Sequence, residues 1–278
     1  MEGFMRLWSQ KSPDTPIWRA NSERNFEERE KTEFSNIEIS NIEINGEQAR
    51  AQVKYNFSYV EAKTGKLQTT NPQRIFRFVK EGGAWKMWRN RVLEEDLAFS
   101  LADLKTNAER QALLEKYPEL QTPRLWRALN LAGERMLRDE ELDRALDFYE
   151  FMLRFSERIN YRAGVADSTT RKGTVYNRKG EYEKALEQCQ RSLQMSEKEN
   201  EKRSAGRALQ CLGNTYNFQG NYVQALDSYQ AALKIGEEVQ DTTIATLINM
   251  GAMYGYLGDS GQAIRLIQEA IALREKQG

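Results

Sequence analysis

Two different spacings of apolar side chains divide the chain. In the first ninety residues apolar and polar positions alternate, and in QARAQVKYNFSYV every second residue is apolar, from Ala51 to Tyr59. A period of two places successive side chains on opposite faces of a strand, so this region is predicted to form a sheet. Further along, apolar residues recur every three or four positions, which is typical of amphipathic helices. A sheet domain followed by helices is therefore expected.

Turn residues divide the strand region into segments. Three dipeptides carry turn signals, namely Asn45-Gly46, Thr64-Gly65 and Gly82-Gly83. In FSNIEISNIEI the isoleucines change parity, which indicates a bulge near Ser40-Asn41. We expect an antiparallel meander of about four strands. Helical pieces are expected before it, around residues 3–9 and 22–33.

A connector links the sheet region to the rest of the chain. Residues 93–121 are predicted to be helical up to Pro118, with Leu97, Leu101 and Leu104 at the i, i+4 and i+7 spacing of one packed face. Glycine and serine are scarce in this segment. A rigid connection is therefore expected rather than a flexible linker.

The remainder of the chain is an internal repeat. The segment GNTYNFQGNYVQALDSYQAAL begins at Gly213, and it matches segments that begin at Gly173 and Gly251 and, more weakly, one at Gly133. The glycines are 40, 40 and 38 residues apart, and an alanine follows each of them after twelve residues. Two columns that stay in register through four copies identify an array of four units.

The glycines of the repeat have structural explanations. A glycine inside a helix costs about 1 kcal/mol relative to alanine, so Gly173, Gly213 and Gly251 predict a close crossing by a partner helix. The turn glycines, such as Gly220, suit the left-handed position that ends a helix. A phosphate-binding loop is excluded, because GNTYNFQGNY lacks both the spacing and the lysine of G-x-x-x-x-G-K-[ST].

These units resemble tetratricopeptide repeats (TPR). The family's small-residue, tyrosine, glycine, tyrosine and alanine positions are met in the third unit by Gly213, Tyr216, Gly220, Tyr222 and Ala225. The 40-residue spacing is similar to that of the longer-helix repeats of kinesin light chains and bacterial TPR arrays. The first unit departs from the pattern at Met136 and Glu140, as terminal repeats often do. The resemblance implies an all-α solenoid over residues 122–278, in units of about 122–160, 161–200, 201–240 and 241–276.

The resemblance also implies a binding face. First helices of TPR units line a concave groove that receives peptides or partner helices, and asparagine amides there can donate to and accept from a peptide backbone. The candidate partner-binding residues are Asn130, Arg138, Asn177, Arg178, Arg207, Gln210, Asn214, Asn217, Phe218, Asn249 and Tyr256. Asn214 resembles the groove asparagine of TPRs that clamp a C-terminal carboxylate, but the lysines of such a clamp are not evident. For each residue the alternative is an ordinary solvated helix position.

Three segments of the sheet region carry a second resemblance. They are FMRLWS near the start, INGEQARAQV in a central strand and GAWKMW in a late strand. Together they resemble the cone-shaped domain of the nuclear transport factor 2-like superfamily, which includes SnoaL-like proteins. The resemblance implies a partial α+β cone over residues 1–92, built from helices and a curved antiparallel sheet. The order of cone, connector and repeats resembles the front half of bacterial TPR proteins that often carry a CHAT protease-like domain. The chain is therefore expected to be part of a longer protein, or to meet a partner through its last helix.

Enzymes of the cone superfamily place an Asp, Glu, His or Tyr in the cavity as general base. The chain contains no histidine, and the row of the central strand that is expected to face inward has no carboxylate. No catalytic residue is therefore assigned. Four aromatic residues, Tyr55, Tyr59, Trp85 and Trp88, form a candidate pocket for an apolar ligand, and the alternative for them is ordinary core packing.

Composition narrows the functional classes further. The 278 residues include 41 basic and 41 acidic side chains, so net charge gives no pull toward nucleic acid or anionic lipid. No apolar run reaches membrane-spanning length. Without histidine the commonest transition-metal ligand is missing, and no metal or cofactor is expected. Cys189 and Cys211 fit no metal or redox spacing. We expect them to be separate core fillers in the reducing environment of the cytoplasm.

Together these observations favour a non-catalytic interaction scaffold whose TPR groove binds a protein or peptide. Self-association through the sheet or the last repeat is a further expectation. The alternative is a cone that binds a small ligand or performs isomerase-like or hydrolase-like chemistry, with the repeats as a recruiting module.

Overall fold

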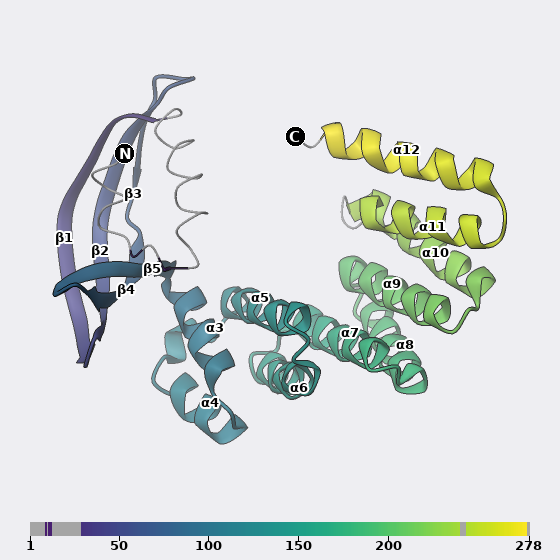
Figure 1. Cartoon of the computed structure of the whole chain (residues 1–278), viewed down its shortest axis with the longest axis horizontal. Coiled ribbons are helices and arrows are strands. Elements are labelled where there is room, and N and C mark those ends of the chain that lie inside the picture. The colour runs from purple at the N-terminus through teal and green to yellow at the C-terminus, as the bar shows by residue number, and fades with distance from the viewer. Residues whose placement is uncertain (1–8, 10, 13–28, 240–242, 277–278) are drawn as a thin grey trace. The chain divides into compact units, whose positions relative to one another are not determined.

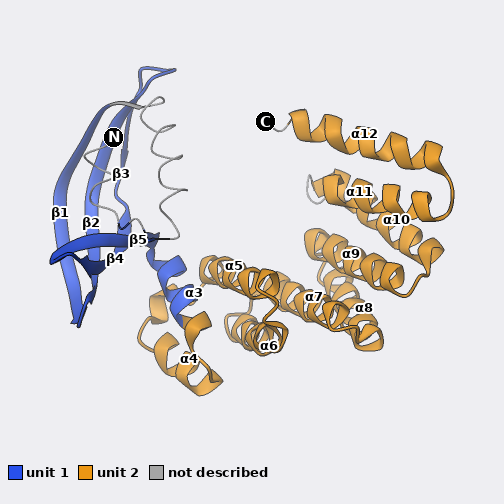
Figure 2. Cartoon of the chain, viewed as in Figure 1, with its two compact units in different colours: residues 1–100 blue, residues 101–278 orange. Residues whose placement is uncertain are grey.

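The computed structural model describes residues 9, 11–12, 29–239 and 243–276 (Figure 1). The chain divides into two compact units, Met1–Ser100 and Leu101–Gly278, which Figure 2 colours separately. The first unit contains an antiparallel sheet, and the second consists of helices. The predicted fold class, an α+β domain followed by an all-α solenoid, is confirmed.

The sheet contains five strands in the order β1-β2-β4-β5, with β3 paired to the end of β2. Its strands are β1 (Arg29–Asn45), β2 (Gln48–Glu61), β3 (Leu67–Thr70), β4 (Gln73–Glu81) and β5 (Ala84–Val92). The three predicted turns connect β1 to β2, β2 to β3 and β4 to β5, and each contains glycine with positive φ. The prediction of about four strands missed only the four-residue strand β3.

Strand β1 is long and carries regularly spaced bulges. Its register against β2 shifts three times, and Lys31, Asn36 and Asn41 have φ angles of 48°, 49° and 48° at these places. The bulge predicted near Ser40-Asn41 is confirmed. The helical piece predicted around residues 22–33 is wrong for residues 29–33, which pair with β2 as strand. The rest of that piece, and all but Ser9 of the piece around residues 3–9, lie outside the described residues.

The connector is two helices and a short turn of 3-10 helix rather than one continuous helix. The elements are α3 (Leu93–Asp103), α4 (Asn107–Leu114) and η1 (Pro118–Leu120). The break comes from a capping box: Thr106 Oγ1 accepts from the backbone of Glu109, and the Glu109 side chain accepts from the backbone N–H of Thr106. Leu104 therefore lies beyond the end of α3, and the prediction that it continues the apolar face of one helix is wrong.

The helical array consists of four pairs of helices. The first helices are α5 (Pro123–Arg138), α7 (Arg162–Arg178), α9 (Lys202–Phe218) and α11 (Thr243–Tyr256). The second helices are α6 (Leu142–Arg158), α8 (Tyr182–Lys198), α10 (Tyr222–Val239) and α12 (Ser260–Lys276). Each second helix packs against the first helix of its own pair, and α6, α8 and α10 also pack against the first helix of the next pair. Thr122 caps α5 through its side chain, and Pro123 is the first residue of the helix.

The glycines of the first helices lie where a second helix crosses closely. A Cβ atom at Gly213 would lie 2.5 Å from the ring of Tyr229, and one at Gly133 would lie 2.7 Å from the ring of Tyr149. In both pairs the obstructing residue follows the glycine by sixteen positions. The predicted close crossing is therefore confirmed, and a tyrosine ring fills the space that a side chain would need.

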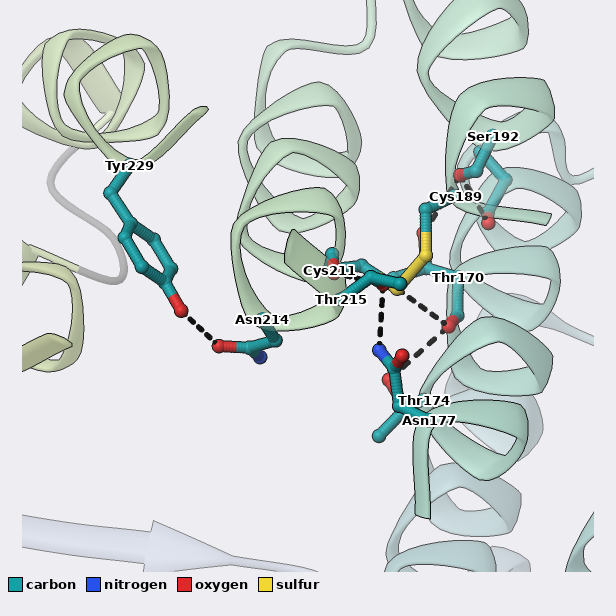
Figure 3. Close-up of a disulfide and its surroundings, with 10 residues drawn as sticks. Thr170, Thr174, Asn177, Cys189, Ser192, Cys211, Asn214, Thr215 and Tyr229 are labelled. Atoms are coloured by element: carbon teal, nitrogen blue, oxygen red, sulfur yellow. Dashed lines mark hydrogen bonds between the residues drawn. A yellow bond between two sulfur atoms is a disulfide. The ribbon is translucent and has the colours of Figure 1, made fainter. Parts of the chain in front are cut away.

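Cys189 of α8 and Cys211 of α9 form a disulfide (Figure 3). Both residues are buried, as expected, but the prediction that they are separate thiols is wrong. Residues 22 positions apart meet because α8 packs directly on α9, which brings their Cα atoms to 5.8 Å. Gly173 leaves room for both sulfur atoms, since a Cβ there would lie 2.6 Å from Cys189 Sγ and 3.0 Å from Cys211 Sγ. The inference of a reducing compartment loses its support.

Candidate functional site

Successive first helices of the array are joined by side-chain hydrogen bonds of 2.5 to 3.3 Å. Between α5 and α7 these are Trp126 to Ser168 and Arg171 to Glu134; between α7 and α9, Asn177 to Thr215 and Arg207 to Asp167; between α9 and α11, Gln210 to Thr246 and Asn249 to Asn214. Polar residues of different units are therefore neighbours. We call the surface formed by Asn130, Glu134, Arg171, Gln210, Asn214 and Asn249 the first-helix face.

Asn214 on the first-helix face is held by two hydrogen bonds to its side-chain oxygen. Its Oδ1 accepts a 2.6 Å hydrogen bond from the hydroxyl of Tyr229 in α10 (Figure 3) and a 3.3 Å bond from Nδ2 of Asn249 in α11. The amide group is planar, so fixing its oxygen also fixes the direction of its two N–H donors. Asn214 is half-buried. The arrangement orients an amide donor at a position that solvent reaches.

The hydroxyl of Tyr229 is protonated and held in place, so it acts as the hydrogen-bond donor in this contact. Its side chain is fully buried, and burial raises the pKa of its hydroxyl well above the ordinary value of 10.0. The hydroxyl therefore stays protonated at neutral pH. Because the ring occupies the space beside Gly213, packing holds the hydroxyl in place as well.

The first unit lacks the equivalent contact. Tyr149 occupies the position of Tyr229, but its hydroxyl is buried with no hydrogen-bond partner within the described structure. Glu134 stands at the position of Asn214, and its Oε1 accepts from Arg171 at 2.5 Å and from Asn130 at 3.1 Å. The same fold position therefore holds an ion pair in unit one and an oriented amide in unit three.

Several predicted partner-binding residues take part in contacts between units. Asn177 is only 6% exposed, and its Nδ2 donates to Thr215 at 2.9 Å, so it lies inside the array. Arg178 Nη1 donates to the carbonyl of Leu137 at 2.5 Å, near the end of α5. The contact links the last residue of α7 to the last turn of α5.

The two aromatic candidates, Phe218 and Tyr256, are exposed and stack on the preceding unit. Phe218 lies over Tyr182 with ring centroids 6.1 Å apart, and Tyr256 lies over Tyr222 at 4.9 Å. Of the other candidates, Arg138 is exposed, while Asn130, Arg207 and Asn217 are half-buried. The exposed and half-buried candidates remain accessible to a partner.

Asp167 in α7 is a buried carboxylate that the sequence reasoning missed. Burial raises its pKa, while the neighbouring Arg207 guanidinium, 2.6 Å away, and Ser204 act in the opposite direction. The signal was present in the repeat: Arg207 follows Asp167 by 40 residues, which places the two on adjacent first helices. The pair joins units two and three beside the first-helix face.

In the sheet unit the main buried charge is Asp96 of α3, which is 2% exposed. Its two carboxylate oxygens accept from Arg50 Nε at 3.1 Å and from Arg77 Nε at 2.6 Å. Sequence reasoning missed this cluster because it considered only the apolar row of β2, and Arg50 belongs to the opposite row. With both oxygens engaged by arginines, the carboxylate fastens α3 to the sheet.

A cavity of about 440 Å³ lies next to this cluster. Trp88 lines it together with Arg50, Arg77 and Arg89, whereas Tyr55, Tyr59 and Trp85 are not among its lining residues. Of the candidate pocket residues, the structure thus brings only Trp88 to the cavity. In the described ranges no three potential metal-ligating side chains come together, and no helix there has the length and hydropathy that a bilayer crossing requires.

Comparison with known families gives one match. The tetratricopeptide repeat family model matches residues 164–238 and 204–276, which covers most of α7 and all of α8 to α12. The repeat resemblance is thereby confirmed for this part of the chain. No curated protein sequence matches the chain significantly.

The chain is also similar to several solved structures. BtubC from P. vanneervenii is 19% identical, with 62% of this chain and 74% of that chain covered and a TM-score of 0.46. MamA (41-end) from Desulfovibrio magneticus RS-1 is 17% identical, with 66% and 97% covered and a TM-score of 0.41. Aspartyl phosphate phosphatase F from Bacillus subtilis is 18% identical, with 63% and 47% covered and a TM-score of 0.46.

Proposed function

We propose that the helical array is a protein-binding scaffold whose first-helix face holds an extended segment of a partner protein. The observation that carries the proposal is the fixed amide of Asn214, whose oxygen is taken by Tyr229 and Asn249. The match of residues 164–276 to the tetratricopeptide repeat family supports the same function. Within this family the first helices are the surface that receives peptides and partner helices.

The chemistry of the face indicates what kind of segment it receives. Units three and four contribute amides, Gln210, Asn214 and Asn249, and these groups suit backbone N–H and C=O groups better than charged side chains. An oriented amide donor loses little conformational freedom on binding, which favours affinity. The partner segment is therefore extended, with backbone groups free to pair, and it lies across α9 and α11.

Accessible residues at the ends of the first helices extend this surface. Phe218 and Tyr256 each present one side of a stacked aromatic pair, and such rings favour contact with apolar side chains. Asn177 is left out because it is buried. The proposal thus combines a polar centre at Asn214 with aromatic contacts at its margin.

The proposal does not extend to catalysis. The buried carboxylate of the sheet unit, Asp96, has both oxygens occupied by arginines and is not available as a general base in this arrangement. We assign it to the stability of the fold.

The test begins with a peptide selected on the full chain from a display library of random linear peptides. Its affinity is then measured by calorimetry for the wild type, for Asn214→Ala and for Gln230→Ala, an exposed position on second helix α10 that serves as the control. We expect Asn214→Ala to weaken binding about tenfold, the effect of one well-placed hydrogen bond, and Gln230→Ala to leave it unchanged. Equal affinity of the selected peptide for the wild type and for Asn214→Ala would contradict the proposal. A selection that yields no binding peptide would contradict it as well.

A further inference from the structure

Strand β1 exposes an unusual run of large apolar side chains. Phe34, Ile37, Ile39, Ile42 and Ile44 are each between 58% and 67% exposed. All five belong to a strand that, among the described residues, pairs with β2 alone and forms an edge of the sheet. Isolated exposed apolar residues are common on protein surfaces, but a contiguous row of this kind marks an interaction site.

The bulges of β1 bring the row onto one face. Phe34, Ile39 and Ile44 lie opposite Phe57, Val53 and Ala49 of β2 in the pairing register. Residues directly opposite one another in a sheet share a face, and the three β2 residues share one parity. Five-residue spacing would alternate faces in a regular strand, but one bulge in each interval restores the same face. The rings of Phe34 and Phe57, 4.9 Å apart, agree with this placement.

The opposite face of the same two strands is polar. Glu38 lies opposite Lys54, and Glu43 lies opposite Arg50, whose Nη1 is 3.5 Å from the carboxylate. By contrast, from Phe34 to Ile44 the β1 residues on the apolar face carry no charge, and neither do the β2 residues from Ala49 to Tyr59 that share it. Arg74 of β4, opposite Val53, is a charge on the neighbouring strand of this face. Two copies can therefore pack over the stretch of β1 from Phe34 to Ile44 without bringing like charges of β1 together.

The edge of β1 is a poorer docking surface than its face. Bulges with positive φ at Lys31, Asn36 and Asn41 interrupt the regular series of backbone groups that another strand would need. A partner that adds a strand to this edge is therefore disfavoured. The apolar side chains remain available for packing of one sheet against another.

We propose that a second copy of this chain covers this face, with the two β1 strands antiparallel about a two-fold axis near Ile39. The intervals from Phe34 to Ile39 and from Ile39 to Ile44 are equal, and this symmetry of the row is the reason for proposing a second copy as the partner. Under that axis Ile39 meets its own copy, while Phe34 meets Ile44, so the row complements itself as an isologous interface requires. The five side chains expose on the order of 500 Å² per copy. A stable interface buries roughly 800 Å² per partner, and the half-buried aromatic residues of β2 supply part of the remaining area.

The first experiment measures the oligomeric state of the full chain by light scattering over a concentration series. We expect a dimer whose dissociation constant rises about thirtyfold or more in Ile39→Asp, since a charge at the centre of the interface would be desolvated. The control is Leu67→Asp: Leu67 is 69% exposed, and it lies opposite Val60 and so on the other face of the sheet. Circular dichroism confirms that each variant is folded. A chain that stays monomeric, or a dimer that Ile39→Asp leaves intact, overturns the proposal.

The second experiment does not depend on how well the aspartate variant folds. Ile39→Cys introduces the only free thiol, because the two natural cysteines are paired with each other. Under mild oxidation we expect a covalent dimer from Ile39→Cys and none from Leu67→Cys. Phe34→Cys mixed with Ile44→Cys should give the mixed dimer more readily than either gives its own dimer. Equal cross-linking of Ile39→Cys and Leu67→Cys, or none from either, also overturns the proposal.

Discussion

The hydroxyl of Tyr229 donates a 2.6 Å hydrogen bond to the side-chain oxygen of Asn214. The contact joins a second helix, α10, to the first-helix face of its own unit, and it turns the amide donors of Asn214 in one direction. The same ring lies against Gly213, so the residue that allows the close crossing and the residue that faces solvent are neighbours in sequence. Packing and proposed binding therefore depend on one tyrosine.

The close crossing at Gly213 predicts a large effect of a single methyl group. In Gly213→Ala the new Cβ would lie 2.5 Å from the ring of Tyr229, and moving that buried ring should cost about 1–3 kcal/mol of unfolding free energy. Gly255→Ala is the matched control, because α11 has open space around its Cβ position and alanine is the better helix former. Urea denaturation of the three proteins checks this. Equal stability of both variants would show that the crossing is looser than described.

Glu140 predicts a stabilising substitution. It lies two residues after the end of α5 and has a φ of 58°, in the left-handed conformation that Gly180, Gly220 and Gly258 adopt in the other units. A non-glycine residue there is strained, so Glu140→Gly should raise the melting temperature by an amount corresponding to about 1 kcal/mol. Glu140→Ala keeps the strain and should bring no such gain. A loss of stability in Glu140→Gly would mean that the exposed glutamate makes a contribution larger than the strain.

The disulfide predicts a dependence of stability on reductant. The bridge closes a loop of 22 residues between α8 and α9, and such a loop corresponds to about 3 kcal/mol in the chain-entropy account. The wild type should therefore unfold at lower urea concentration after reduction, while the double variant Cys189→Ala/Cys211→Ala should give one midpoint in both conditions. Alkylation followed by intact mass measurement reports the redox state. If reductant leaves the wild-type midpoint unchanged although mass measurement verifies reduction, the stabilisation attributed to the disulfide would be contradicted.

Asp167 predicts a specific pH dependence. Because burial raises its pKa above the ordinary value of 3.8, the folded state holds the proton more tightly than the unfolded state. Its contribution to stability is thus fully present below pH 3.8 and is lost as pH rises through the folded pKa. Relative to Asp167→Asn, the wild type should lose unfolding free energy as pH rises from below 4 toward neutrality. Urea midpoints measured over this range test the sign, and parallel curves for the two proteins would refute it.

Much of the array could be predicted from sequence because its determinants are local and repeated. Glycine at a helix crossing leaves a visible signature, since it is costly in a helix and recurs at Gly133, Gly173, Gly213 and Gly251. The turn signals of the sheet were equally local. Turn signals depend on adjacent residues, and the crossing glycines can be recognised because they recur in each unit.

The features that escaped prediction depend on which helices or strands become neighbours. Cys189 and Cys211 meet only because α8 packs on α9, and no spacing rule covers that pair. Asn177 is an amide on a first helix, the kind of residue expected in a binding groove. The orientation of α7 nevertheless directs its side chain toward Thr215 of the next unit. The Asp96 cluster combines side chains from two strands and a helix, which a parity argument on β2 alone does not reach.

The most direct test of the account is the effect of Tyr229→Phe on binding of the selected peptide. This substitution keeps the ring beside Gly213 and removes only the hydroxyl that holds Asn214. Calorimetry should give a dissociation constant several-fold higher for Tyr229→Phe than for the wild type, with little further change when Tyr229→Phe is added to Asn214→Ala, because the two residues act as one unit. Binding by Tyr229→Phe with wild-type affinity, or full additivity of the two substitutions, would contradict the claim that Tyr229 orients Asn214 for a partner.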